Sequence, residues 1–319
     1  MCAYTIGLDL GGTKIAAALV GENGKPAFKA ADLTHPEEGV DAVIERMAAC
    51  IRNLQAQSEA PLSGLGIGTA GMTDSLNGVV IMASNLKWKN VPVRILLSEK
   101  LGSDWLERTW VDKDTNAAAL GEMLYGVGRG SQHLLYVTVG TGIGGGMVLD
   151  GKLYHGASQG ASDIGHLVLL PNGPLCGCGK RGCLEALASG TAIARIAGEA
   201  LQSGTNSLLS SVLDSKPLSA QDVVEAARLG DGLSLEILEK AGAWLGQGLA
   251  YYVDINNPEL IIIGGGIAAA GELLLEPVKR AIRQFALPNN VQTVQVLPAG
   301  LGPDSGVIGA AALAWHHLK

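Results

Sequence analysis

The sequence predicts an α/β protein with two domains. At 319 residues the chain is longer than one typical hydrophobic core, which predicts two domains of roughly 150 residues each. Segments with strand-like and helix-like hydrophobic periods alternate along it. A strand, a turn with glycine and threonine, and a returning strand occur at 3–20 and again at 134–149. This repetition predicts two related halves that face each other.

The elements of the first half follow from hydrophobic period and turn residues. Apolar and β-branched runs predict strands at 3–10, 15–20, 26–33, 62–69 and 106–111. Helical spacing of apolar residues, a proline in a first turn and a run of alanines predict helices at 37–57, 92–101 and 117–124, respectively. Residues 70–73 are expected to form a loop.

The second half continues the alternation. Strands are expected at 134–139, 145–149, 258–263 and 291–296. Helices are expected at 191–202, 220–229, 233–253 and 305–317, with a further helix from Gly264–Gly266 to Phe285. The polar segment 202–217 is expected to be a mobile loop. We place a first domain at 1–115, with the final helix, about 304–319, packing back on it, and a second domain at 116–303.

Charge and hydropathy limit the classes of partner. The net charge is -7 and the isoelectric point is about 5.4, which disfavours nucleic acid or an anionic membrane as a partner. The N-terminus enters a strand-like run without a secretory signal. The longest uncharged run, 134–149, is interrupted by glycines and too short to span a bilayer. We therefore expect a cytoplasmic protein with a small-molecule ligand.

The segment 163–185 predicts a zinc-binding loop. It contains His166, Cys176, Cys178 and Cys183, and thiolate sulfur and imidazole nitrogen are the donors that tetrahedral zinc prefers. A complete Cys3His set leaves no open position, so the metal would be structural. A disulfide is the alternative, but an odd number of clustered cysteines without a secretory signal points away from it. The metal would fix the flanking polar residues and so form a wall of a binding site.

The two glycine turns predict phosphate binding. The turn from Asp9 to Lys14 offers successive backbone N–H groups for phosphate oxygens, and Asp9 is placed to hold Mg2+ with its water shell. The turn 140–144 fits the glycine spacing of a dinucleotide site, but it continues as a strand, which excludes that site. Two such turns suit a nucleoside triphosphate held between domains. The alternative is that each is an ordinary hairpin turn.

Two further positions are candidates for the same site. Gly265 lies in a glycine cluster that either gives a nucleotide ring access to the backbone or simply joins a strand to a helix. Asp114 follows a strand and precedes a helix, where a carboxylate caps the helix or accepts a substrate proton during phosphoryl transfer. Asp112 and Asp163 are less well placed for proton transfer. His35, His133 and His155 are expected to be structural or surface residues.

Five motifs in this order resemble the ROK family of bacterial sugar kinases and sugar-responsive repressors. They are DLGGTK at 9–14, DKDTNAAALGE at 112–122, VTVGTGIGGG at 137–146, DIGH at 163–166 with CGCGKRGCLE at 176–185, and IIIGGG at 261–266. The resemblance implies a two-domain, actin-like ATPase (ribonuclease H-like) fold with a zinc-binding loop, usually as a homodimer. It also implies that ATP and a sugar meet in the cleft.

The resemblance also implies roles for individual residues. Asp114 would be the general base. The ATP and Mg2+ site would contain Asp9, Gly11, Gly12, Thr13, Lys14, Thr138, Gly140, Thr141, Gly142 and Gly265. The sugar site would contain Gly71, Asn85, Lys113, Asp163, His166 and Glu185. Structural Zn2+ would be bound by His166, Cys176, Cys178 and Cys183.

Two positions depart from the family pattern. Lys113 stands where the family usually has Asn, and Asp163 where it usually has Glu. The two side chains are hypothesised to form a linked pair that reshapes the sugar pocket; alternatively, Lys113 favours an anionic substrate or turns to solvent. The expected activity is ATP-dependent phosphorylation of a hexose at the 6-hydroxyl, as in glucokinases. The alternatives are an N-acetylmannosamine or N-acetylglucosamine kinase, a kinase for an unusual polyol, and a sugar-sensing regulator without catalysis. Repressors of the family carry a DNA-binding extension before the first hairpin, and only eight residues precede Asp9 here, so we expect a kinase.

Overall fold

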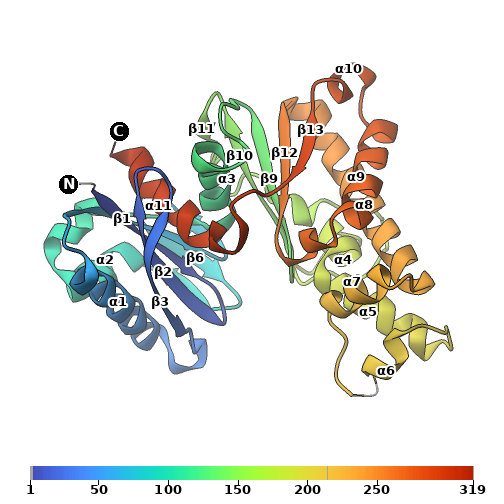
Figure 1. The fold of residues 1–319 in the computed structure, drawn as a ribbon, viewed down its shortest axis with the longest axis horizontal. Helices are drawn as coiled ribbons and strands as arrows, with labels where there is room; N and C mark the ends of the chain where they lie inside the picture. The colour runs from blue at the N-terminus through green and yellow to red at the C-terminus, as the bar shows by residue number, and fades with distance from the viewer. Residues whose placement is uncertain (1–2, 214, 319) are drawn as a thin grey trace. The chain divides into compact units, whose positions relative to one another are not determined.

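The computed structural model describes residues 3–213 and 215–318 (Figure 1). Within them the chain forms two compact α/β units, so the expected α/β class is confirmed. The first unit contains residues up to 132, together with 146–161 and 300 onward. The second contains residues 133–145 and 162–299. Residues 116–132 thus lie with the first sheet. No helix of the described ranges is long and apolar enough to cross a bilayer.

The first unit is built on a five-stranded mixed sheet in the order β3-β2-β1-β4-β8. The strands are β1 (Tyr4–Leu10), β2 (Lys14–Gly21), β3 (Pro26–Leu33), β4 (Leu62–Thr69) and β8 (Thr109–Lys113). Three neighbouring strands, β1, β4 and the edge strand β8, are parallel. At their carboxyl ends Leu10 pairs with Thr69, and Thr69 pairs with Lys113. Their carboxyl ends therefore meet at one edge of the sheet, which brings the turn after β1 close to the residue that follows β8.

Helices cover both faces of the first sheet. On one face α1 (Val40–Gln57) and α2 (Val93–Leu101) bury apolar side chains against the strands. On the other face α11 (Ser305–His317) packs on β1 and β4, and α3 (Asp114–Tyr125) packs on α11. Glycines make this close packing possible, because a Cβ on Gly7 would overlap the Val307 carbonyl and one on Gly66 would overlap the Ala310 carbonyl. In Figure 1 the red α11 accordingly lies beside the blue strands.

The second unit contains most of the helices and the greater part of the second large sheet, whose residues 146–153 belong to the first unit. The sheet order is β11-β10-β9-β12-β13, with β9 (Leu134–Val139), β10 (Ile143–Leu149), β11 (Lys152–Leu153), β12 (Leu260–Gly264) and β13 (Gln295–Pro298). The helices are α4 (Leu184–Ala188), α5 (Gly190–Gln202), α6 (Leu209–Leu213), α7 (Ala220–Arg228), α8 (Gly232–Asn256), α9 (Glu272–Phe285) and α10 (Pro288–Val291). The long helices α8 and α9 lie side by side (Figure 1). Their close approach depends on Gly242 and Gly246, whose added Cβ atoms would crowd the carbonyls of Leu274 and Val278.

Several expected boundaries were wrong. The strand expected at 106–111 begins at Thr109, because Ser103–Arg108 forms the 3-10 helix η2. The strand expected at 291–296 begins at Gln295, because Pro288 starts α10. The returning strand of the second hairpin begins at Ile143 rather than Gly145.

Three further expectations differ from the structure. The helix expected to run to Phe285 is divided at Gly271, which has a φ of 60° and separates η4 (Gly266–Ala270) from α9. The expected loop 202–217 contains α6. The expected loop at 70–73 contains the start of β5 (Met72–Asp74), which forms a small antiparallel sheet with β6 (Val79–Ala83) and β7 (Trp88–Val91).

Candidate active site

The first glycine turn, 11–13, is held by backbone and threonine hydrogen bonds. The Gly11 N–H donates to the Lys14 carbonyl at 3.0 Å, and the Thr34 hydroxyl donates to the Gly11 carbonyl at 2.7 Å. A Cβ added to Gly12 would lie 3.0 Å from the Cβ of Asn85, which follows β6. The structure therefore brings Asn85, a predicted sugar contact, against the predicted phosphate turn. Gly71 also lies at this end of β6, where its φ is 101° and a Cβ would overlap the Met82 carbonyl.

Asp114 is the first residue of α3, directly after β8. Its Oδ1 accepts a hydrogen bond from the Thr115 N–H at 2.7 Å, which uses one carboxylate oxygen at the helix N-terminus. Gly68 on the neighbouring strand allows a close approach, because its added Cβ would lie 3.6 Å from the Asp114 Cα. The N-cap position itself belongs to Lys113, whose Nζ donates to the Ala161 carbonyl at 3.4 Å.

Asp9 and Asp114 form an acidic pair in the first unit. Burial and, to a lesser extent, the charge of Asp114 raise the pKa of Asp9 to about 6, against the opposing charge of Lys14. Asp9 also lies against the first turn of α11, where a Cβ on Gly306 would overlap its Oδ2. A divalent cation would relieve the repulsion between the two carboxylates, and oxygen donors are those that Mg2+ prefers.

A second polar network lies behind Asp114, on Asp112. This side chain is only 4% exposed, and its Oδ1 accepts hydrogen bonds from the Lys113 N–H at 2.7 Å and from the Asn116 amide at 2.8 Å. Its Oδ2 lies 2.7 Å from His155 Nε2, and this hydrogen bond raises the pKa of His155. Sequence analysis assigned no role to this pair. No signal in the sequence spacing reveals it, because the two residues come from separate parts of the chain.

The second glycine turn, in the second unit, is held by α5. The Gly140 N–H donates to the Gly142 carbonyl at 2.9 Å, which closes the turn. The Gly190 N–H donates to the Gly140 carbonyl at 2.7 Å, and the Thr191 hydroxyl donates to the Thr141 carbonyl at 2.8 Å.

The third glycine cluster meets this turn. Gly265 has a φ of 85°, and its added Cβ would lie 2.5 Å from the Val139 carbonyl and 2.7 Å from the Thr138 hydroxyl. The five residues predicted for nucleotide binding in this unit are therefore neighbours: Thr138, Gly140, Thr141, Gly142 and Gly265.

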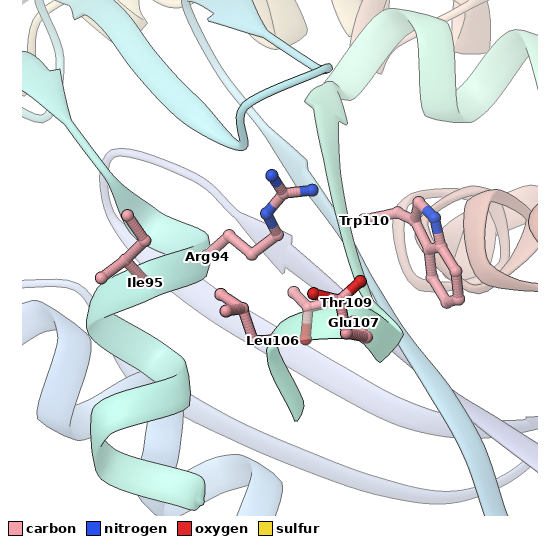
Figure 2. Close-up of a pocket in the computed structure, with 6 residues that line it drawn as sticks. All are labelled: Arg94, Ile95, Leu106, Glu107, Thr109 and Trp110. Carbon is pink, nitrogen blue, oxygen red and sulfur yellow. The ribbon is translucent and has the colours of Figure 1, made fainter. Parts of the chain in front are cut away.

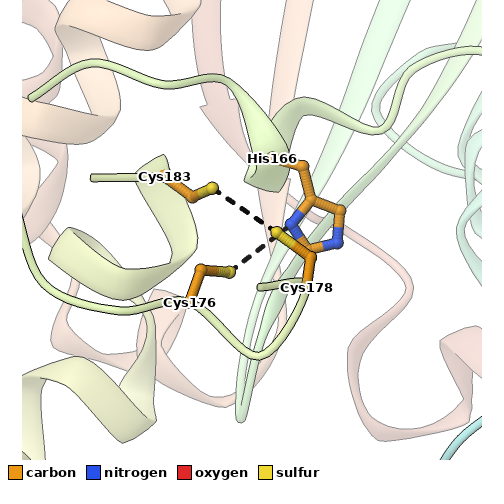
Figure 3. A group of neighbouring side chains, drawn as sticks. All are labelled: His166, Cys176, Cys178 and Cys183. Carbon is orange, nitrogen blue, oxygen red and sulfur yellow. Dashed lines mark hydrogen bonds between the residues drawn. The ribbon is translucent and has the colours of Figure 1, made fainter. Parts of the chain in front are cut away.

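The four predicted zinc ligands come together (Figure 3). One donor atom from each of His166, Cys176, Cys178 and Cys183 lies within 4.8 Å of the others. The Cys178 and Cys183 sulfurs are 3.7 Å apart, as are the Cys176 sulfur and His166 Nδ1. Two sulfurs bonded at about 2.3 Å to a tetrahedral zinc would lie about 3.8 Å apart, so the cluster fits this metal.

The chemical state of the three clustered cysteines agrees with a metal site. All described cysteines are free thiols, so no disulfide forms in this loop within 3–213 and 215–318. Burial raises the pKa of Cys176 to about 12. A bound cation would be needed to hold this sulfur as the thiolate that ligates metal.

Glu185 lies between the cysteine loop and the second turn. Its Oε2 accepts a hydrogen bond from the Ile143 N–H at 3.0 Å, and its Oε1 lies 3.7 Å from the Cys176 sulfur. Asp163 precedes η3 (Ile164–His166) and is exposed, and its charge adds to burial in raising the pKa of Tyr252 to about 12. Asp163, His166 and Glu185 thus lie in one part of the second unit, at the zinc cluster.

A further pocket lies outside the predicted site (Figure 2). It has a volume of about 290 Å³ and lies at the edge strand β8. Its lining residues are Arg94, Ile95, Leu106, Glu107, Thr109 and Trp110. None of the predicted site residues lines this pocket.

Comparison with known proteins identifies relatives over nearly the whole chain. The sequence model of the ROK family matches residues 5–317. A glucokinase of Thermotoga maritima is 40% identical over 310 residues, which cover 97% of this chain and 96% of the relative. The structure of a ROK family glucokinase from Streptomyces griseus, in complex with glucose and AMPPNP, matches with a TM-score of 0.84 and 34% identity over 98% of this chain and 99% of that one. The structure of a ROK hexokinase from Thermus thermophilus matches with a TM-score of 0.81 and 34% identity over 99% of both chains.

Proposed function

The chain belongs to the ROK family, and from this premise we propose that it is an ATP-dependent hexose kinase of the glucokinase type. Its fold is the actin-like ATPase fold that the sequence analysis expected. The observation that carries the proposal is the likeness to glucokinases, 40% identity across nearly the full length of both chains. The acidic pair Asp9 and Asp114 supports it, because phosphoryl transfer to an alcohol requires a carboxylate base and a cation site.

Asp114 is the proposed general base. As the sugar oxygen, usually on C6, bonds to the γ-phosphorus and the bond to the β,γ-bridging oxygen breaks, the hydroxyl proton passes to the Asp114 carboxylate. The Thr115 N–H at 2.7 Å orients the carboxylate, because it holds Oδ1. ADP leaves with the bridging oxygen. The sugar phosphate is released after the proton returns to solvent.

The glycine turns are the proposed nucleotide contacts. Gly11, Gly12, Thr13 and Lys14 in the first unit, and Thr138, Gly140, Thr141, Gly142 and Gly265 in the second, offer backbone amides, hydroxyls and one ammonium group to phosphates and nucleoside. Asp9 would hold Mg2+ through its water shell, and this cation would neutralise the charge that develops on the phosphate oxygens.

The proposed sugar contacts include acidic, basic and neutral hydrogen-bonding side chains and one glycine. They are Gly71, Asn85, Lys113, Asp163, His166 and Glu185. The proposed structural Zn2+, bound by His166 and the three cysteines, would fix the loop that carries the last three. The linked pair of Lys113 and Asp163 remains a proposal about specificity.

A coupled assay of ADP release tests the function. The sugars compared are glucose, mannose, N-acetylglucosamine and N-acetylmannosamine. We expect the highest turnover of ATP with glucose. A preference for either N-acetylated sugar would instead support a hexosamine kinase. The absence of ADP release with every sugar, in protein that binds sugar, would identify a sensor without catalysis and overturn the proposal.

We also propose that the protein is a homodimer that associates through the second unit. Tyr251 and Ile255 lie one helical turn apart on α8, and Ile255 is 78% exposed. Leu287, 60% exposed, is fixed beside them because its N–H donates to Asp254 at 2.9 Å. An exposed apolar patch of this kind is typical of an interaction surface. Light scattering should give a dimer for the native protein and a monomer for Ile255→Asp, whereas a native monomer would refute this.

A further inference from the structure

The segment from Cys183 to Thr191 joins the zinc cluster to the second glycine turn. Cys183 is one of the four clustered donors and is also the N-cap of α4. Ser189 follows α4 and caps α5 by accepting a hydrogen bond from the Ala192 N–H at 3.2 Å. The segment is thus a short helix between two fixed ends, with a potential metal ligand at one end and the start of α5 at the other.

The segment contacts three positions of the turn. Besides the Gly190 and Thr191 hydrogen bonds to the carbonyls of Gly140 and Thr141, the Glu185 carboxylate accepts the Ile143 N–H at 3.0 Å. These contacts fix both sides of the turn. A shift of the segment would therefore shift the turn that is proposed to hold the nucleotide.

The near end of the segment is tied to the cysteine loop. Cys183 pairs with Val168 in an isolated bridge, and the Leu184 N–H donates to the Leu167 carbonyl at 2.8 Å, directly after His166. The second oxygen of Glu185 lies 3.7 Å from the Cys176 sulfur. Glu185 thus contacts a metal ligand with one oxygen and the glycine turn with the other.

Packing between the segment and the turn leaves little room for independent movement. A Cβ on Gly142 would overlap Glu185 Oε2, and one on Gly190 would lie 2.7 Å from the Gly140 carbonyl. Close-packed contacts of this kind transmit displacement because they cannot be compressed. The two sites are therefore mechanically connected within the second unit.

We propose that Glu185 and the segment 183–191 are a positioning element through which metal occupancy of the cysteine cluster sets the affinity of the second glycine turn for nucleotide. This inference rests on the proposed function, since it assigns the turn to ATP. It gives the metal a role beyond the sugar side of the site. It also gives Glu185 a role that does not require a bound sugar.

The test is the affinity for AMPPNP with Mg2+, measured by calorimetry without sugar. We expect zinc-loaded protein to bind AMPPNP about tenfold more tightly than chelated protein, a typical strength for coupled sites. Glu185→Gln keeps the side-chain volume but loses the negative charge and one of the two oxygen acceptors. In this variant the ratio of the affinities with and without zinc should fall toward one. Thr191→Val should weaken AMPPNP binding severalfold while zinc content, measured by mass spectrometry, stays complete.

Ser203→Ala is the matched control. Its hydroxyl donates within α5 to the Glu199 carbonyl at 2.9 Å and contacts neither the turn nor the cysteines, so it should keep the native zinc dependence. Equal AMPPNP affinity with and without zinc, in protein that circular dichroism shows to be folded, would overturn the inference. Failure of zinc-loaded protein to bind AMPPNP at all would overturn the proposed function instead.

If chelation unfolds the protein, hydrogen exchange decides. In zinc-loaded Glu185→Gln, the amides of 138–145 should exchange faster than in the native protein, and those of β3, in the first unit, should be unchanged. Identical exchange at 138–145 in the native protein and the variant would refute the positioning role.

Discussion

The two glycine turns have the same local pattern but different surroundings. The first, at 11–13, lies beside two carboxylates, and the pKa of Asp9 is raised to about 6 by burial and by Asp114. The second, at 140–144, is held by backbone contacts from α5 and by Glu185, which faces the cysteine cluster. The difference indicates a division of labour. The first turn is suited to cation and proton chemistry, and the second to holding an anionic group in a fixed shape.

The largest expected effect concerns the charge at the first turn. Asp114→Asn should lower kcat by about 10²–10⁴-fold, because it removes the proposed proton acceptor with little change in size. Sugar affinity, measured by calorimetry, should change far less. A variant with near-native turnover would show that Asp114 is not the base.

Metal removal tests the second turn's surroundings. Chelation of zinc should weaken sugar binding about 10–100-fold, since residues that orient a site commonly contribute that much. Fluorescence titration with sugar, before and after zinc is restored, measures the effect. Normal sugar binding by metal-free protein would exclude a role for the metal in shaping the pocket.

Adding one methyl group at Gly142 tests how tightly the second turn is packed. Gly142→Ala should raise the KM for ATP about tenfold, because the added Cβ would overlap the Glu185 carboxylate and displace the turn. Gly198→Ala on α5 is the control, since its added Cβ would meet no atom within 4 Å. An unchanged KM in Gly142→Ala would mean that the turn and Glu185 move freely.

The network behind the first turn should have a stability effect that depends on pH. His155→Ala should lower the free energy of unfolding by about 1–3 kcal/mol, because it removes the hydrogen bond to Oδ2 of the buried Asp112 carboxylate. The hydrogen bond to Asp112 raises the folded-state pKa of His155 above 6.5. Burial and the charges of Lys113 and His317 lower this pKa, but their effect is smaller. The charged His155–Asp112 pair therefore contributes its full stabilisation below pH 6.5. This stabilisation is lost as the pH rises through the folded-state pKa of His155.

Urea unfolding at pH 6 and pH 9 measures this dependence. The difference between native protein and His155→Ala should be larger at pH 6. His35→Ala, which removes an exposed pair with Glu37, should leave the free energy of unfolding almost unchanged at either pH. A loss in His155→Ala that is the same at both values would contradict the charged form of the pair.

The smallest expected effect concerns substrate choice. Lys113→Asn should alter the relative kcat/KM values within the sugar panel by about threefold to tenfold, which corresponds to one exchanged polar contact. Identical values for every sugar would mean that Lys113 has no part in specificity.

The sequence predicts the elements well where local signals agree. The strands Pro26–Leu33 and Leu62–Thr69 and the helix Ser305–His317 have the expected bounds, because each has one clear period between turn residues. The zinc cluster was also predicted, because donor type alone identifies it. By contrast, β6 and β7 were not predicted. They are short strands of one small sheet, and short runs of this kind carry little periodic signal.

The contacts that tertiary structure creates could not be read from the sequence. His155 was expected to be a structural or surface residue, but its hydrogen-bond partner, Asp112, could not be identified from the spacing. Glu185 was predicted from the family resemblance as a sugar contact, but its position between Cys176 and Ile143 depends on how α4 and α5 pack. Pairings between distant segments leave no trace in local spacing, because any residue of suitable chemistry on either segment would give the same pattern.

The packing of α11 on β1 and β4 has a consequence for biosynthesis. Gly7 and Gly66 leave room for the backbone carbonyls of Val307 and Ala310, on a helix that is translated long after these strands. While the ribosome is still adding residues before 305, these glycines and the apolar side chains of Ala18 and Val20 lack their covering partners on this helix, among them Val307 and Ala311. The first unit therefore completes its folding only after residues 305–317 have been synthesised, and a nascent chain stalled before them would expose this apolar surface to chaperones.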